Sequence, residues 1–125
     1  MNESYDPRYL EGIDYFNRRA FFRAHEVWEE LWTDTQGPAR QFYQGLIQVA
    51  VCLHHFGNGN LRGARKLYHS STEYLSAYLP RHAGLDVEHL LHDLQVCCAP
   101  LLDDPEQPPR AKLVPDQIPR LRLSL

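Results

Sequence analysis

The stretch His25–Trp32, HEVWEELW, combines one histidine, three glutamates and two tryptophans within about two helical turns. Imidazole and carboxylate groups bind divalent metals and transfer protons, so this stretch is the strongest candidate for chemistry in the chain. With about 100° between successive helical residues, Glu26 and Glu30 turn away from His25, whereas Glu29 stays beside it. Five residues then share the inner face of the helix: Phe21, His25, Trp28, Glu29 and Trp32.

A metal site is one interpretation of this face. The stretch is similar to the H-E-x-x-H helix of zinc proteases, but Glu29 stands where the second histidine would be. The His25/Glu29 pair offers one nitrogen and one carboxylate to zinc, manganese or iron, so at least one more ligand must come from elsewhere. His55 is the best supplier. The predicted metal ligands are therefore His25, Glu29 and His55.

A second polar stripe is expected on the helix predicted over residues 38–56, which is otherwise apolar nearly all round. Gln44, Gln48 and His55 lie within about 40° of one another on that helix. The simplest arrangement packs it antiparallel on the helix that carries His25, so that the two polar stripes meet in a shared pocket. The residues predicted to line this pocket are Trp28, Trp32, Gln44, Gln48, Asn17 and Asn60.

Three interpretations of this cluster remain open. A buried imidazole needs a partner, because leaving a polar group unpaired costs on the order of 1–3 kcal/mol. The residues can form a divalent-metal site, a pocket for a small polar ligand, or a closed hydrogen-bond network in a non-catalytic structural or protein-interaction module. General acid–base catalysis by His25 and Glu29 is conceivable, but no catalytic motif or nucleotide-binding loop accompanies them, so an enzyme is not indicated.

The elements that must position these residues are helices, because apolar residues recur at spacings of three and four without strict alternation. Asp6 and Asn60 are typical helix N-caps, and breaks are expected at Gly37-Pro38, Gly57 and Pro80. The predicted helices cover residues 7–17, the following stretch to about 33, 38–56, 61–79 and 87–99. We predict an all-α fold, a compact bundle of about five helices, in a single domain of residues 1–101.

The tail of residues 102–125 has a different character. It holds five of the nine prolines, which leaves no room for a helix of useful length, and we expect it to be extended. Its spaced apolar residues predict that it packs on the helical domain or on a second subunit; a disordered tail is the alternative. Because the tail and the tyrosine-rich stretch 61–79 supply much apolar surface, a homodimer is predicted.

Composition excludes several classes of protein. No apolar run approaches the roughly 18–20 residues needed to cross a bilayer, so a membrane role is not expected. The net charge is −3 and the basic residues are scattered, which argues against nucleic-acid binding. The N-terminus does not resemble a secretory signal, and we expect a cytoplasmic protein. Three cysteines, two of them adjacent, form no disulfide or CxxC pattern and are predicted to fill the core.

The HxxxExxW pattern formed by His25, Glu29 and Trp32 resembles the motif of the DUF309 family, small helical proteins of bacteria and archaea whose function is not established. Three further stretches resemble the family pattern in order and spacing: Phe16-Asn17, Gln44-Gly-Leu-Ile-Gln48 and Gly59-Asn-Leu-Arg-Gly-Ala64. The resemblance covers about residues 14–79. It implies a small all-helical array, and it implies metal binding by the His/Glu motif without assigning a reaction.

Overall fold

The computed structural model of this chain describes residues 5–102 and 112–124. Residues 1–4 lie outside the described residues. So do residues 103–111 and Leu125, which belong to the tail that the sequence predicts to be extended.

Five helices make up most of the regular structure in the described part of the chain. They are α1 (Pro7–Asn17), α2 (Phe21–Thr33), α3 (Ala39–Gly57), α4 (Leu61–Ser76) and α5 (Val87–Leu102). The predicted all-α fold of about five helices is confirmed. Among the described residues, no helix has the length and apolar character needed to cross a membrane.

Side-chain caps explain where three of these helices begin. Asp6, Asn60 and Asp86 accept hydrogen bonds from backbone N–H groups in the first turns of α1, α4 and α5, at 2.8, 3.1 and 2.9 Å. Each cap satisfies a backbone N–H that has no partner inside its own helix. The predicted capping role of Asn60 is confirmed.

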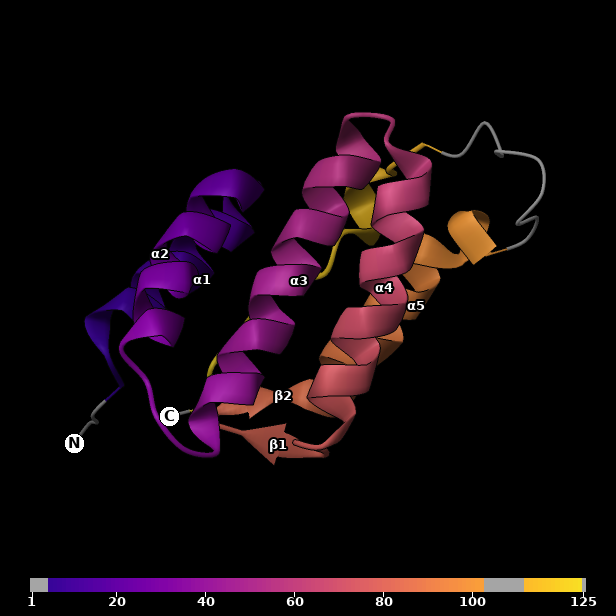
Figure 1. Ribbon diagram of the computed structural model, residues 1–125. Coiled ribbons are helices and arrows are strands. Elements are labelled where there is room, and N and C mark those ends of the chain that lie inside the picture. Colours follow the sequence, from indigo (N-terminus) through magenta and orange to yellow (C-terminus); the bar gives the residue numbers. More distant parts are fainter. Residues whose placement is uncertain (1–4, 103–111, 125) are drawn as a thin grey trace.

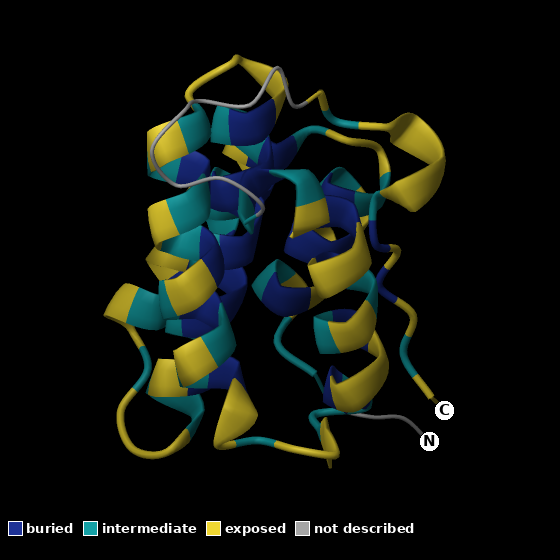
Figure 2. Cartoon of the chain, turned by 90° about the vertical axis from the view of Figure 1, so that its right-hand side faces the viewer, coloured by how far each residue is buried: buried dark blue, intermediate teal, exposed yellow. Residues whose placement is uncertain are grey.

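The helices are arranged around α3. In Figure 1, α1 and α2 lie on one flank of α3, α4 lies on the other, and α5 packs on α4. The short connection of residues 34–38 turns the chain back on itself, so α2 and α3 run antiparallel, as predicted. Buried residues are on the sides of the helices that face one another in Figure 2. This order sets one side of α2 against α3, where the polar stripes are expected to meet.

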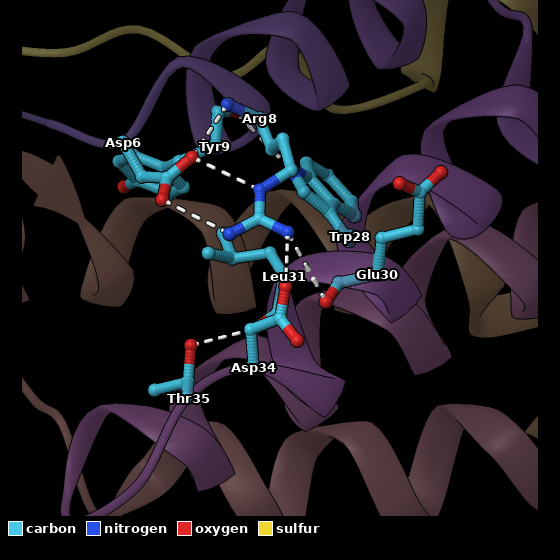
Figure 3. A network of polar contacts seen from close by, with 8 residues as sticks. All are labelled: Asp6, Arg8, Tyr9, Trp28, Glu30, Leu31, Asp34 and Thr35. Carbon is cyan, nitrogen blue, oxygen red and sulfur yellow. Dashed lines mark hydrogen bonds and ion pairs between the residues drawn. The ribbon is translucent and has the colours of Figure 1, made fainter.

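Trp28 is the largest fully buried side chain, and it joins α2 to α1. Its indole N–H donates a hydrogen bond to the backbone oxygen of Tyr9 at 3.2 Å (Figure 3). Its ring lies directly over Gly12, where a Cβ atom would come within 2.0 Å of Trp28 Nε1. Because the backbone of α1 and the ring of Trp28 are in direct contact, the rotation of α2 about its own axis is set by this residue.

Charged residues close the exposed edge of the same α1–α2 contact (Figure 3). Arg8 Nη1 lies 2.7 Å from Asp34 Oδ2, and Arg8 Nε lies 3.3 Å from Asp6 Oδ1. The hydrogen bonds from Arg8 lower the pKa of Asp6 and those to both carboxylates raise the pKa of Arg8. Since these groups are in contact with water, they fix the geometry of the helix ends more than they add stability.

The three cysteines lie in the core. Cys52, Cys97 and Cys98 are free thiols, and none is more than 1% exposed. A hydrogen bond with Cys98, together with burial, raises the pKa of Cys97, and a hydrogen bond with Cys52 raises the pKa of Cys98. The thiols of Cys97 and Cys98 therefore stay protonated at neutral pH, which agrees with the prediction that the cysteines fill the core.

A small hairpin before α5 adds two short strands that the all-α prediction did not include. β1 (Arg81–His82) pairs antiparallel with β2 (Leu85–Asp86). The two turn residues, Ala83 and Gly84, have φ values of 49° and 76°. Two residues with positive φ are what a two-residue hairpin turn requires. Strands this short carry no alternation that a sequence pattern can detect.

Two helix ends also differ from the prediction. α4 ends at Ser76, short of residue 79, and α5 continues through Pro100 to Leu102 instead of ending at about residue 99. Proline removes one backbone donor from a helix but does not forbid a final turn when that turn is packed. Leu101, which is 1% exposed, supplies that packing.

Residues 112–124, here called the C-terminal segment, pack against the helical domain without regular structure apart from the 3-10 helix η1 (Pro115–Gln117). The amide of Asn17 holds the backbone of Leu121 from both sides, donating to its oxygen and accepting from its N–H, each at 2.8 Å. Leu121 is 2% exposed, and Leu123 forms a β-bridge with Leu85. The described part of the tail thus closes one side of the core.

We expect Gly12→Ala to destabilise the protein by on the order of 3 kcal/mol, because the new methyl group would overlap the indole of Trp28. Urea unfolding followed by circular dichroism measures this change. Gly57→Ala is the matched control, since its Cβ would lie an ordinary 3.6 Å from Leu113, and it should leave the free energy of unfolding nearly unchanged. Equal stability of the Gly12 variant and the native protein would contradict the Trp28 contact.

His82 is a second residue whose surroundings predict a measurable effect. Its ring packs against those of Phe42 and Tyr78, with centroids 4.5 and 4.8 Å away, and this burial lowers the pKa of His82. The unfolded chain, with a histidine pKa of about 6.5, then binds more protons than the folded protein. His82 therefore contributes stability that is complete above about pH 6.5 and is lost as the pH falls below it.

Unfolding measured between about pH 7.5 and 5 should show a smaller loss of stability in His82→Asn than in the native protein. His92→Asn, which changes an exposed histidine, should lose as much stability as the native protein. If His82→Asn and His92→Asn respond alike to pH, His82 is not the titrating group.

Candidate functional site

His25 and Glu29 form the predicted pair on α2. His25 Nε2 and Glu29 Oε2 are 3.2 Å apart, and their side chains are 20% and 58% exposed. The prediction that the imidazole of His25 is buried is only partly correct, because the side chain is 20% exposed and its ring lies beside that of Phe22, which is 51% exposed. Helix α3 therefore covers only part of the inner face of α2 near His25.

The contact with Glu29 decides which nitrogen of His25 is available. A neutral imidazole carries one N–H and one lone pair, and a carboxylate accepts hydrogen bonds. When Nε2 donates to Glu29, Nδ1 keeps the lone pair. Nδ1 of His25 is buried and has no hydrogen-bond partner among the described residues. The contact with Glu29 therefore leaves Nδ1 as an open hydrogen-bond acceptor on the buried side of the imidazole ring.

Trp32 lies two turns further along α2 and is covered by a cation. The guanidinium carbon of Arg40, on the first turn of α3, is 3.8 Å from the centre of the Trp32 ring. The indole Nε1 of Trp32 is buried and, within the described part of the chain, has no acceptor. Arg40 is not among the predicted site residues, although its place near the start of α3, a short antiparallel connection after the last turn of α2, indicates that it lies close to Trp32.

Gln48 brings the third polar atom from α3. Its side-chain oxygen is buried without a partner among the described residues, whereas Gln44 has no such atom. Two ring contacts, Phe22 with His54 at 5.4 Å and Arg40 with Trp32, give the antiparallel register of α2 and α3. With about 1.5 Å of rise per residue, that register sets Gln48 at about the level of residues 24–28. Gln48 is thus near the level of His25.

The structure does not assemble the predicted metal ligands into one group. His55 Nδ1 lies 3.4 Å from Asn60 Nδ2, at the turn between α3 and α4. Within residues 5–102 and 112–124, no group of three or more histidine, cysteine, aspartate or glutamate side chains is arranged to hold a metal ion. The His25/Glu29 pair alone therefore does not fit the metal centre that the family resemblance implied.

Two other predicted pocket residues make contacts away from this face. Trp28 points into the contact between α1 and α2, where its N–H binds Tyr9. The amide of Asn17 is used by the backbone of Leu121. Neither contact involves His25 or Glu29.

Few buried side-chain atoms lack a hydrogen-bond partner in the described part of the chain. The described residues contain four such atoms, and three belong to His25, Trp32 and Gln48. The fourth belongs to Thr72 on α4. Buried polar atoms are nearly always hydrogen-bonded in native proteins, so three unpartnered atoms on α2 and α3 make the surface between these helices the candidate site. We call this surface the α2–α3 polar face; its residues are His25, Glu29, Trp32, Arg40, Gln44 and Gln48.

A family model described as "Domain of unknown function (DUF309)" matches residues 9–67. This region belongs to the DUF309 family. The resemblance stated from the sequence is confirmed, although the matched region ends at residue 67 and not near 79. The DUF309 region contains all six residues of the α2–α3 polar face, and it contains Gly12 and Trp28, which orient α2.

Two bacterial proteins are similar to this chain. "Uncharacterized protein YpuF" of Bacillus subtilis (strain 168) is 33% identical over 95 residues, which are 73% of this chain and 55% of the Bacillus protein. An "Uncharacterized protein" of Aquifex aeolicus (strain VF5) is 41% identical over 46 residues, which are 36% of this chain and 14% of that protein. The chain thus spans about half the length of the Bacillus relative and a small part of the Aquifex one.

Replacing each of the two tryptophans by phenylalanine should change the free energy of unfolding by very different amounts. Trp28→Phe removes the donor to Tyr9 and opens a void over Gly12, and it should cost on the order of 2–3 kcal/mol. Trp32→Phe removes a buried donor that has no protein partner, and it should change the free energy of unfolding by less than about 1 kcal/mol. Urea unfolding of both variants tests this. Equal losses would contradict the assignment of Trp28 to the core and Trp32 to the polar face.

Proposed function

We propose that the α2–α3 polar face is a binding site for a small polar molecule. The observation that carries this proposal is the group of buried, unpartnered atoms on His25, Trp32 and Gln48. A closed packing network would leave its members satisfied, because each buried atom without a partner costs about 1–3 kcal/mol. A ligand that forms hydrogen bonds with these atoms removes this cost, and the free energy gained favours binding.

The donors and acceptors of the face define what the ligand should present. Trp32 Nε1 is a donor only, and Gln48 Oε1 is an acceptor only. Nδ1 of His25 is an acceptor as long as Nε2 donates to Glu29. The ligand therefore needs hydrogen-bond donors near His25 and Gln48 and an acceptor near Trp32, about 10 Å along the helix from His25.

Charged groups at the two ends of the α2–α3 polar face favour the same orientation of the ligand. Glu29 supplies a negative charge beside His25, and Arg40 supplies a positive charge over Trp32. An amino group at the first end would meet two acceptors near the negative charge of Glu29, and an acid group at the second would meet an indole donor and a guanidinium. We therefore favour a small zwitterion, a molecule of the amino-acid class, as the ligand.

A divalent metal is the second candidate, favoured by one observation. Carboxylates that bind one nitrogen of a histidine commonly orient the other nitrogen toward a metal, and Glu29 stands in that relation to His25. Under this alternative Glu29 orients the ligating histidine and is not itself a ligand. The remaining ligands would come from outside the face, so the metal is the weaker of the two candidates.

Replacing Gln48 by methionine separates a binding site from a packing network. Gln48→Met keeps the volume of the side chain but removes the buried, unpartnered oxygen, so we expect it to stabilise the protein by about 1 kcal/mol. Gln44→Met makes the same change at a position without such an atom and should be close to neutral. Chemical unfolding measures both. A clear loss of stability in Gln48→Met would favour the packing network and contradict the proposal.

Binding itself can be read from the two indole N–H signals of the chain in a proton–nitrogen NMR spectrum. We expect β-alanine, used as the probe, to move the signal of Trp32 and to leave the signal of Trp28 in place. Propionate and propylamine carry one of its two charges each and should act more weakly; zinc chloride tests the metal. A Trp32 signal that β-alanine leaves unmoved would contradict the zwitterion, and a response to zinc alone would select the metal.

A further inference from the structure

A cavity of about 580 Å³ lies on another part of the molecule, between the β1–β2 hairpin, the first turns of α5 and the C-terminal segment. None of its lining residues belongs to the α2–α3 polar face. Its volume is within the roughly 300–1,000 Å³ typical of small-molecule sites. Six ionisable residues line it: Arg81, Asp86, His89, Asp93, Arg120 and Arg122.

The carboxylates of this cavity are already engaged by protein groups. Asp86 Oδ2 lies 3.6 Å from Arg81 Nη1, and Asp86 Oδ1 also caps α5 through the backbone N–H of His89. Asp93 Oδ2 lies 3.0 Å from His89 Nε2. Arg81 donates a further hydrogen bond to the hydroxyl of Ser124. The acidic groups are therefore held close to Arg81 and to His89.

Arg120 and Arg122 supply the excess positive charge. Within the described residues, neither takes part in an ion pair. Three arginines and two aspartates face the cavity, so the cavity is positive, whereas the whole chain has a net charge of −3. A locally positive cavity attracts small anions at short range, although the net charge of the whole chain is negative.

The fold holds these two arginines on one side of the C-terminal segment. Leu121 between them is buried, and the amide of Asn17 fixes both of its backbone groups. The backbone is fixed again just beyond them, where Ser124 N donates to Gly84 O at 2.8 Å. In an extended backbone alternate side chains point to the same side, so Arg120 and Arg122 both face the cavity when Leu121 points inward. The spacing of about 6.6 Å between them lets two guanidinium groups reach one anion.

We propose that this cavity binds a phosphate group. Guanidinium groups recognise phosphate oxygens through paired hydrogen bonds, and a phosphate dianion matches the two arginines better than a single carboxylate does. Arg120 and Arg122 hold the phosphate, and Arg81 completes the positive side of the cavity. The phosphate belongs to a small phosphorylated molecule or to a lipid headgroup, and the chemistry of recognition is the same in both.

Titration of the full chain with inorganic phosphate and with pyrophosphate, followed by NMR and calorimetry, tests this proposal. We expect saturable binding, on the order of millimolar for phosphate, with the signals of His89, Arg120 and Arg122 shifting first. Arg120→Gln/Arg122→Gln should weaken binding about tenfold or more. Arg62→Gln/Lys66→Gln removes the same charge from two exposed positions of α4 and should leave the affinity unchanged.

The signal shifts identify the site even if the double arginine variant does not fold. Equal weakening by both double variants, or shifts spread over the surface and reproduced by chloride at the same ionic strength, would overturn the proposal. So would an absence of saturable binding by the native chain. Co-sedimentation with phosphatidylcholine vesicles, with and without phosphatidic acid, distinguishes the two sources of the phosphate. If the chain binds the acidic vesicles and Arg120→Gln/Arg122→Gln abolishes this binding, the ligand is a lipid headgroup. If phosphate binds in solution but the chain does not bind the vesicles, the ligand is a free phosphorylated molecule.

Discussion

The contact between Trp28 and Gly12 is the constraint on which the rest of this structure depends. A glycine in α1 leaves space for an indole at the helix backbone, and the indole N–H then reaches the carbonyl of Tyr9. Once this ring is fixed, α2 cannot rotate about its axis without breaking a buried hydrogen bond and losing close packing. The rotation of α2 in turn decides which of its residues face α3 and which are in contact with water.

The α2–α3 polar face follows from that rotation. With Trp28 in the core, His25 and Trp32 fall at the edge of the interface with α3, opposite Gln48 and Arg40. Three buried polar atoms then have no partner among the described residues, which lowers the stability of the protein alone. Proteins commonly retain such unfavourable groups where they bind something, because stability and function make different demands on the same residues.

α1 also connects the face to the second site. Its last residue, Asn17, holds the C-terminal segment through the backbone of Leu121, and that segment carries Arg120 and Arg122 to the cavity beside α5. Residues more than a hundred positions apart in the chain are thus joined by one amide side chain. The first helix therefore orients α2 through Gly12 and the C-terminal segment through Asn17, so both proposed sites depend on it.

The sequence by itself determined the local features of this protein. Apolar spacing, caps and breaks predicted the five helices, and the spacing of His25 and Glu29 predicted their contact, because these features arise within one helix. The tertiary structure alone decided that Trp28 faces α1, that His55 meets Asn60 and not His25, and that Arg40 covers Trp32. The β1–β2 hairpin and the arginine cavity belong to this second group. Each depends on the rotation and register of helices relative to one another, and a helical repeat does not specify the packing between helices.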